Sequence, residues 1–161
     1  MINKYTQAGK STYSDMRIIC CYKLSRKGEA NYYIPKIWGN RKLLWHGTRL
    51  TNFDGILTHG LKIAPPDAPK TGELFGKGVY FADIIAKSYP YAHANLYDDI
   101  GTLILAEVAL GNTRELNKPN DDAANLPPGK NSTHALGKLR PDPAGDIKIM
   151  NDVTVPLGRL Q

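Results

Sequence analysis

Residues 43–49 read Leu-Leu-Trp-His-Gly-Thr-Arg, an apolar run that leads directly into a histidine and a glycine. The apolar run predicts a short strand. Glycine lets a ligand approach the main chain closely, so that its N–H and C=O groups stay accessible. An amide ligand needs such a pair of one donor and one acceptor. His46 and Gly47 are therefore candidates for amide binding, although a buried histidine before a turn gives the same pattern.

A second segment, residues 75–91 (FGKGVYFADIIAKSYPY), also combines glycines with polar side chains. Residues 78–82 predict a short strand. Asp83 predicts the cap of a helix that reaches about residue 94 and is distorted at Pro90.

Three side chains of this segment are candidates for ligand binding. Ser88 can donate a hydrogen bond to a carbonyl group. Tyr80 and Tyr91 are suited to enclose a planar heteroaromatic ring, since offset stacking contributes ~0.5–1.5 kcal/mol beyond the buried area. A tyrosine-rich core explains either tyrosine alone equally well.

The remaining segments predict a strand-rich mixture of helices and strands, which is typical of the α+β class. Alternating or continuous apolar residues predict strands, helical spacing with a glycine stop predicts a helix, and prolines with glycines predict loops. The predicted elements are strands over Met16–Leu24 and Thr102–Leu110, a helix over Thr51–Gly60, a long loop over 117–146 and a last strand or hairpin over Ile147–Val155.

The length of 161 residues fits a single domain. No apolar run reaches the ~18–20 residues that a membrane span needs, and residues 1–13 lack the apolar core of a secretory signal, so we expect an intracellular protein. Cys20 and Cys21 are adjacent and lack Cys-x-x-Cys spacing. We interpret them as strand residues and not as a disulfide or zinc site.

Positive charge is concentrated near the N-terminus. Residues 1–45 contain nine basic and two acidic side chains, a net charge of +7, whereas the other 116 residues sum to −1. Such asymmetry favours contact with nucleic acid or another polyanion, and a solvated lysine-rich face is the simpler alternative.

Several signatures of other enzyme classes are absent from the sequence. It contains no phosphate-binding loop, no Gly-x-Gly-x-x-Gly, no His-Glu-x-x-His and no Gly-x-Ser-x-Gly. The four histidines are too scattered to predict a metal site.

Six segments, in this order, resemble the catalytic domain of the poly(ADP-ribose) polymerase family, above all its DNA-damage-responsive members. The resemblance extends from Tyr22 to Gly158. It implies an ADP-ribosyltransferase-like fold of the α+β class, with a split antiparallel β-sheet and short helices. It also implies a truncated catalytic domain over residues 16–161, preceded by residues 1–15, whose own sequence is typical of a flexible arm. The segments are Leu43–Thr48 (LLWHGT), Thr51–Leu57 (TNFDGIL), Gly60–Pro69 (GLKIAPPDAP), Phe75–Asp83 (FGKGVYFAD), Glu107–Asn112 (EVALGN) and Pro156–Gly158 (PLG).

The resemblance also implies a reaction and roles for individual residues. Family members cleave NAD⁺ at the nicotinamide–ribose bond and transfer ADP-ribose to protein acceptors. By resemblance His46 and Tyr80 are catalytic, and His46 binds the adenosine ribose. Gly47 and Ser88 hold the nicotinamide amide, Tyr91 stacks on its ring, and residues 64–76 form the loop over the donor. The resemblance thus predicts NAD⁺-binding roles for His46, Gly47, Thr48, Gly55, Lys62, Ser88 and Tyr91.

In polymer-forming relatives, a catalytic glutamate lies on a strand a few dozen residues after the Pro-Leu-Gly segment, and no residue up to Gln161 matches it. We therefore expect transfer of single ADP-ribose units rather than polymer, and a sheet edge that can pair with another chain. A catalytically inactive NAD⁺- or nicotinamide-binding protein, a truncated copy of a longer relative, is the alternative. A nuclear location is implied by the resemblance alone, and no metal is expected.

Overall fold

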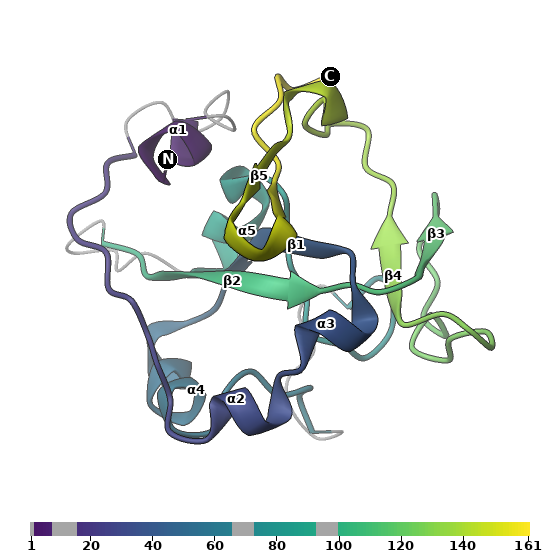
Figure 1. Ribbon diagram of the computed structural model, residues 1–161, viewed down its shortest axis with the longest axis horizontal. Coiled ribbons are helices and arrows are strands. Elements are labelled where there is room, and N and C mark those ends of the chain that lie inside the picture. Colours follow the sequence, from purple (N-terminus) through teal and green to yellow (C-terminus); the bar gives the residue numbers. More distant parts are fainter. Residues whose placement is uncertain (1, 8–15, 66–72, 93–99) are drawn as a thin grey trace.

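The computed structural model describes residues 2–7, 16–65, 73–92 and 100–161 (Figure 1). Most helices lie in the first half of the chain and most strands in the second half. In order they are α1 (Ile2–Gln7), α2 (Glu29–Tyr32), α3 (Pro35–Trp38), β1 (Arg41–Gly47), the 3₁₀ helix η1 (Leu50–Asn52), α4 (Phe53–His59), α5 (Ile85–Ala92), β2 (Leu103–Ala109), β3 (Thr113–Leu116), β4 (Ser132–Ala135), η2 (Pro143–Gly145), β5 (Ile147–Ile149), η3 (Met150–Asp152) and β6 (Val153–Val155).

Four strands form the main sheet in the order β2-β1-β6-β5. β1 pairs antiparallel with β2 over its whole length, from Arg41 opposite Ala109 to Gly47 opposite Leu103. β6 joins β1 in parallel, and β5 pairs antiparallel with β6. β3 and β4 form a separate parallel pair. The predicted α+β class is confirmed, with two parallel pairings beside the expected antiparallel ones.

A small apolar core joins α1, β1, α5 and β6. Tyr5, Trp45, Ile85 and Val155 are each at most 5% exposed. The Tyr5 and Trp45 ring centroids lie 5.2 Å apart, and the Tyr5 hydroxyl donates to the Leu43 carbonyl oxygen at 2.8 Å. Burial raises the pKa of Tyr5 above its ordinary value.

The packing of Tyr5 corrects one prediction. Residues 1–15 were expected to form a flexible arm, but Ile2–Gln7 form a helix whose tyrosine lies in the core. Residue 1 and residues 8–15 lie outside the described part of the chain. The large ring of Tyr5 explains the difference, because its burial against Trp45 offsets the entropy lost when α1 is ordered.

Three predicted elements are confirmed. β2 matches the strand expected over 102–110, and β5 with β6 forms the hairpin expected over 147–155. η1 and α4 match the helix expected over 51–60. Gly60 ends α4 with φ +84°, and its N–H donates to the Ile56 carbonyl oxygen at 2.8 Å.

Other predictions are wrong or incomplete. Residues 16–26 form no strand, and Cys20 and Cys21 are exposed there. Apolar alternation cannot by itself make a strand where no neighbouring strand pairs with it. The strand expected over 78–82 is reduced to one bridge between Trp45 and Ala82. The loop expected over 117–146 contains β4 and η2, and α2 and α3 were not predicted.

The helix expected from Asp83 begins two residues later, at Ile85, and includes Pro90 near its end at Ala92. Its predicted last residues, 93 and 94, lie outside the described residues. Within the described ranges, no helix is both long and apolar enough to cross a membrane.

Candidate functional site

His46 and Gly47 lie at the end of β1, where the strand meets the segment before α5. His46 Nδ1 lies 2.7 Å from the Tyr80 carbonyl oxygen, and its ring centroid lies 5.6 Å from that of Phe81. The neighbouring Trp45 and Ala82 exchange two main-chain hydrogen bonds of 2.8 Å. His46 thus uses one ring nitrogen within the protein, which leaves Nε2 for a ligand.

Gly47 contacts the backbone of α5 so closely that no other residue fits. A Cβ atom added there would lie 1.8 Å from the Ser88 carbonyl oxygen and 2.7 Å from the Ser88 carbonyl carbon. Close approach of two backbones is a known use of glycine. The structure therefore brings Gly47 and Ser88 together, and their role in amide binding stays a prediction.

Ser88 is buried and already has a hydrogen-bond partner. Its side chain is 4% exposed, and its hydroxyl donates to the Trp45 carbonyl oxygen at 3.0 Å. The one hydroxyl proton is therefore used inside the protein, while the oxygen can still accept. To donate to a bound amide, Ser88 must first release the Trp45 carbonyl, which keeps its hydrogen bond from Ala82.

Tyr91 follows Ser88 by three residues on α5 and is 46% exposed. A half-exposed tyrosine ring is available for stacking with a planar ligand. Tyr80 and Tyr91 lie close enough that Tyr91 contributes to the raised pKa of Tyr80. His46, Gly47, Ser88, Tyr80 and Tyr91 therefore belong to one region of the molecule.

The Tyr80 hydroxyl closes the loop that precedes it. It donates to the Gly76 carbonyl oxygen at 2.5 Å and accepts from the Phe75 N–H at 3.1 Å. Burial is the main cause of its raised pKa, the charges of Glu73 and Asp121 add to the shift, and the Phe75 N–H opposes it. Tyr80 is therefore a neutral hydroxyl at physiological pH and is unsuited to act as a base.

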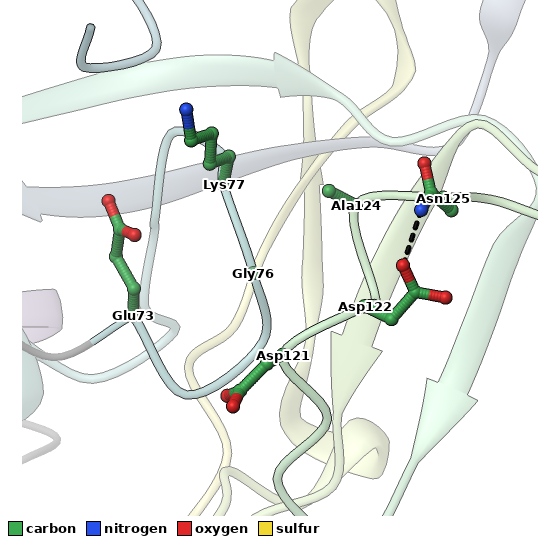
Figure 2. Close-up of a pocket in the computed structure, with 7 residues that line it drawn as sticks. All are labelled: Glu73, Gly76, Lys77, Asp121, Asp122, Ala124 and Asn125. Atoms are coloured by element: carbon green, nitrogen blue, oxygen red, sulfur yellow. Dashed lines mark hydrogen bonds between the residues drawn. The ribbon is translucent and has the colours of Figure 1, made fainter. Parts of the chain in front are cut away.

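A cavity of about 410 Å³ lies beside this loop (Figure 2). Asp121 and Asp122 contribute to it from the segment after β3, and Gly76, with φ +71°, permits the contact because its Cβ would lie 2.6 Å from the Asp121 carbonyl oxygen. The lining has a net negative charge, because it contains three carboxylates and one lysine. It consists of Glu73, Gly76, Lys77, Asp121, Asp122, Ala124 and Asn125.

The sequence did not predict this cavity. Its two halves are more than 40 residues apart, and residues 121–125 fall in the segment interpreted as a loop. The adjacent acidic pair Asp121-Asp122 is the one local signal that could have indicated it. The lining includes none of His46, Gly47, Ser88 or Tyr91.

The other predicted groove residues lie in or beside the η1–α4 segment: Thr48 precedes η1, Gly55 lies in α4 and Lys62 follows α4. Thr48 Oγ1 accepts from Asn52 Nδ2 at 2.8 Å. Gly55 is exposed, with nothing within 4 Å of an added Cβ, and Lys62 is exposed. Among the described residues, no hydrogen bond, ion pair or ring contact joins these three residues to His46 or Tyr91. Most of the predicted donor loop, residues 66–72, lies outside the described residues.

No group of three His, Cys, Asp or Glu side chains in the described ranges is arranged to hold a metal ion.

The chain is similar to known proteins over most of its length. Residues 1–161 match the poly(ADP-ribose) polymerase catalytic domain family. Identity to Poly [ADP-ribose] polymerase 1 of Gallus gallus is 48% over 156 residues, which are 96% of this chain and 15% of that protein. Identity to Poly [ADP-ribose] polymerase 1 of Danio rerio is 50% over 139 residues, 86% of this chain and 14% of that protein.

A plant relative shows a comparable sequence identity. Identity to Poly [ADP-ribose] polymerase 2 of Arabidopsis thaliana is 55% over 120 residues, 74% of this chain and 19% of that protein. The chain thus spans less than one fifth of the length of each of these three relatives.

Proposed function

The chain belongs to the poly(ADP-ribose) polymerase catalytic-domain family, and on that premise we propose that it is an ADP-ribosyltransferase with NAD⁺ as the donor substrate. One observation carries the proposal: Gly47 at the end of β1 lies directly against Ser88 of α5. The two elements that meet at this junction also carry the Nε2 atom of His46 and the half-exposed ring of Tyr91, and both remain available to a ligand.

The described residues fit such a donor in most respects. His46 Nε2 can bind a ribose hydroxyl, and the Tyr91 ring can stack on nicotinamide. Ser88 fits less well, because its hydroxyl proton is held by the Trp45 carbonyl oxygen. The amide group of nicotinamide therefore has two ways to bind. It forms hydrogen bonds with the main chain of Gly47 alone, or it replaces the Trp45 carbonyl oxygen as the acceptor of the Ser88 hydroxyl.

Two effects accelerate the proposed reaction: the site orients NAD⁺, and negative charge stabilises the positive charge that develops on the ribose. Holding the donor at both ends orients the nicotinamide–ribose bond, and orientation alone accounts for a large part of many rate enhancements. Breaking that bond leaves positive charge on the ribose, as in glycoside hydrolysis. Burial is the main cause of the raised pKa of Tyr80, and the carboxylates of Glu73 and Asp121 add to it. Negative charge of this kind favours positive charge that develops near it.

The direct test is release of nicotinamide from NAD⁺ by the purified chain. We expect release that falls at least about tenfold in Tyr91→Ala, equivalent to ~1.4 kcal/mol of lost stabilisation. Tyr32→Ala is the matched control, since Tyr32 is 90% exposed and lies on α2. Equal release by the two variants would count against the proposal.

Mass spectrometry of a modified acceptor protein tests the predicted product. A mass increase of one ADP-ribose per site supports single-unit transfer, and a ladder of increments contradicts it.

Binding without turnover is a second candidate, and the hydrogen bonds of Tyr80 and Ser88 favour it. Both hydroxyls are engaged within the protein, to Gly76 and Trp45 respectively. This candidate predicts measurable affinity for nicotinamide analogues without nicotinamide release. Release that disappears in Tyr80→Phe refutes it, because this change removes only the hydroxyl.

Protein acceptors, a nuclear location and pairing of a sheet edge with another chain remain predictions from family membership and the sequence.

A further inference from the structure

The segment Met16–Lys42 carries as much net charge as the whole chain. It holds seven basic side chains and one acidic side chain, a net charge of +6, so the other residues sum to zero. The segment runs without a break from the extended residues 16–26 through α2 and α3 into β1 (Figure 1). A positive charge confined to one short stretch produces a local field that attracts anions.

Three of these seven cations are exposed and free to meet an anion. Two arginines are engaged: Arg26 with Glu29 at 2.8 Å and Arg41 with Glu107 at 3.0 Å. Three exposed side chains of the segment form no ion pair with a described residue. These are Arg17, Lys23 and Lys27.

Large aromatic rings are interleaved with the cations. Tyr22 is 79% exposed, Tyr32 is 90% exposed and Trp38 is 56% exposed. Scattered exposed apolar residues are normal on a protein surface. Three open rings within 17 residues, on a segment that also carries free cations, are instead the composition of surfaces that bind single-stranded nucleic acid, where rings stack on bases and cations contact phosphates.

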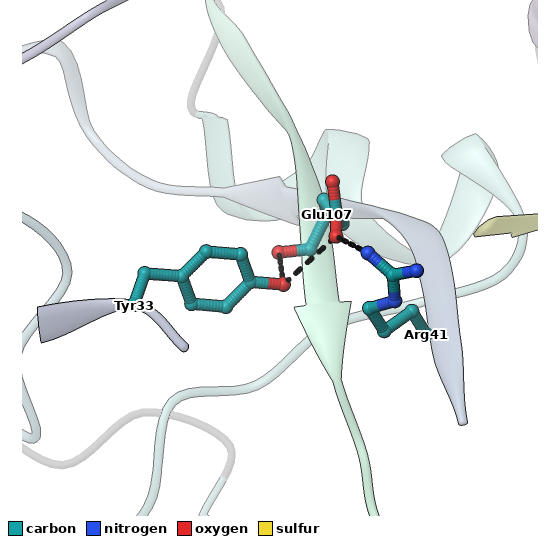
Figure 3. A network of polar contacts seen from close by, with 3 residues as sticks. All are labelled: Tyr33, Arg41 and Glu107. Atoms are coloured by element: carbon teal, nitrogen blue, oxygen red, sulfur yellow. Dashed lines mark hydrogen bonds and ion pairs between the residues drawn. The ribbon is translucent and has the colours of Figure 1, made fainter. Parts of the chain in front are cut away.

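The structure fixes the middle of this segment to the sheet (Figure 3). The Tyr33 hydroxyl donates to the main-chain oxygen of Glu107 at 3.1 Å and lies 3.3 Å from its Oε1, which also pairs with Arg41. Tyr33 is therefore held against β2, while its neighbour Tyr32 remains in solvent. This anchor limits the motion of α2 and so lowers the entropy cost of binding at Tyr32.

We propose that residues 16–38 form a binding surface for single-stranded nucleic acid. Arg17, Lys23 and Lys27 contact phosphates, and Tyr22, Tyr32 and Trp38 stack on unpaired bases. This surface contains none of the site residues His46, Gly47, Tyr80, Ser88 and Tyr91.

The shape of the segment favours a single strand over two other polyanionic partners. α2 and α3 contain four residues each, about 6 Å of helix, which is too short to follow the major groove of a duplex. Helices this short also lack the long apolar face of a helix that lies in a membrane interface. One ring on the extended residues and one on each of two four-residue helices instead present their binding groups in sequence, as a flexible strand does.

Fluorescence anisotropy of the 161-residue chain with a labelled oligo-dT of about 16 nucleotides tests the proposal between ~50 and ~200 mM salt. The triple variant Arg17→Gln/Lys23→Gln/Lys27→Gln should flatten the slope of log K against log salt by about 2, since each phosphate contact contributes ~0.7. Lys118→Gln/Lys138→Gln/Arg159→Gln removes three exposed charges elsewhere and should leave the slope unchanged.

A ring variant, Tyr22→Ala/Tyr32→Ala/Trp38→Ala, tests stacking independently of charge. It should weaken binding about fivefold or more per ring at every salt concentration, with the slope preserved. Because all three side chains are exposed, the circular dichroism spectrum should match that of the unmodified chain.

Four outcomes overturn the proposal. They are absence of binding at ~50 mM salt, equal flattening in both charge variants, preference for a duplex of the same length, and binding to phosphatidylserine vesicles in place of the oligonucleotide. The last result assigns the surface to a membrane.

Discussion

Gly47 shows how one residue determines the geometry of the candidate site. Its missing side chain allows β1 to touch the backbone of Ser88, and the contact places His46 and Tyr91 in the same region. The sequence alone indicated a close approach at Gly47, because a glycine after a strand-borne histidine is a local signal. It could not indicate that α5 makes the approach, since that contact joins residues 41 positions apart in the chain.

Gly47→Ala should destabilise the fold, because the new methyl group would lie 1.8 Å from a main-chain oxygen that cannot move alone. We expect a loss of ~1–3 kcal/mol in the free energy of unfolding, measured by urea denaturation. Gly55→Ala is the matched control. Its Cβ meets nothing within 4 Å and it lies inside α4, so alanine should add ~0.4–1 kcal/mol. Equal effects of the two substitutions would show that Gly47 is not packed as described.

The sequence indicated that Ser88 and Tyr80 belong to the site, but it did not indicate what their hydroxyl groups bind. Pattern and resemblance predicted both as ligand-binding residues. The structure adds that each hydroxyl has a partner inside the protein, the Trp45 and Gly76 carbonyl oxygens. Such hydrogen bonds depend on tertiary contacts, which no local pattern encodes.

At the scale of elements, strands with a continuous apolar pattern were predictable and pairings were not. β2 and the β5–β6 hairpin follow from their own residues. The parallel pairing of β3 with β4 joins Thr113 to Ser132 across a segment that reads as a loop. The alternation of residues 16–24 predicted a strand, but a strand also needs a hydrogen-bonded neighbour, and the segment has none in the described part of the chain.

Tyr33 links α2 to β2, and its titration offers a test of that link. Its pKa is about 12 against an ordinary 10.0, mainly because of burial, with the charge and hydrogen bond of Glu107 adding and Arg41 opposing. Between these two values the unfolded chain loses the proton while the folded chain keeps it. The contribution of Tyr33 is therefore complete below pH ~10 and is lost as the pH rises toward ~12.

We predict that Tyr33→Phe reduces the alkaline loss of stability. In urea denaturation between pH ~9 and ~11, the free energy of unfolding should fall less steeply for this variant than for the unmodified chain. Tyr32→Phe, a change at a 90% exposed neighbour, should retain the original slope. If both variants retain it, the hydroxyl of Tyr33 does not hold α2 to the sheet.

At the scale of the whole molecule, the core depends on a residue from the predicted arm. Tyr5 is 1% exposed and its ring lies 5.2 Å from that of Trp45. Periodicity analysis needs more residues than the six of α1 provide, so the sequence did not indicate this packing.

Tyr5→Ala should therefore cost ~3–5 kcal/mol in the free energy of unfolding, the usual cost of deleting a buried aromatic ring. Tyr22→Ala, at a side chain 79% exposed, should change it by less than ~0.5 kcal/mol. Thermal or urea denaturation of both variants measures these changes in the free energy of unfolding. A small effect at Tyr5 would restore the interpretation of residues 1–15 as an arm outside the domain.

The central claim is that the end of β1 and helix α5 together bind the nicotinamide end of NAD⁺, and calorimetric titration with benzamide tests it most directly. The double variant His46→Ala/Tyr91→Ala should bind benzamide at least about tenfold more weakly than the unmodified chain. His134→Ala/Tyr32→Ala removes the same two residue types from exposed positions and should bind as the unmodified chain does. Equal affinity of all three proteins for benzamide would contradict the claim.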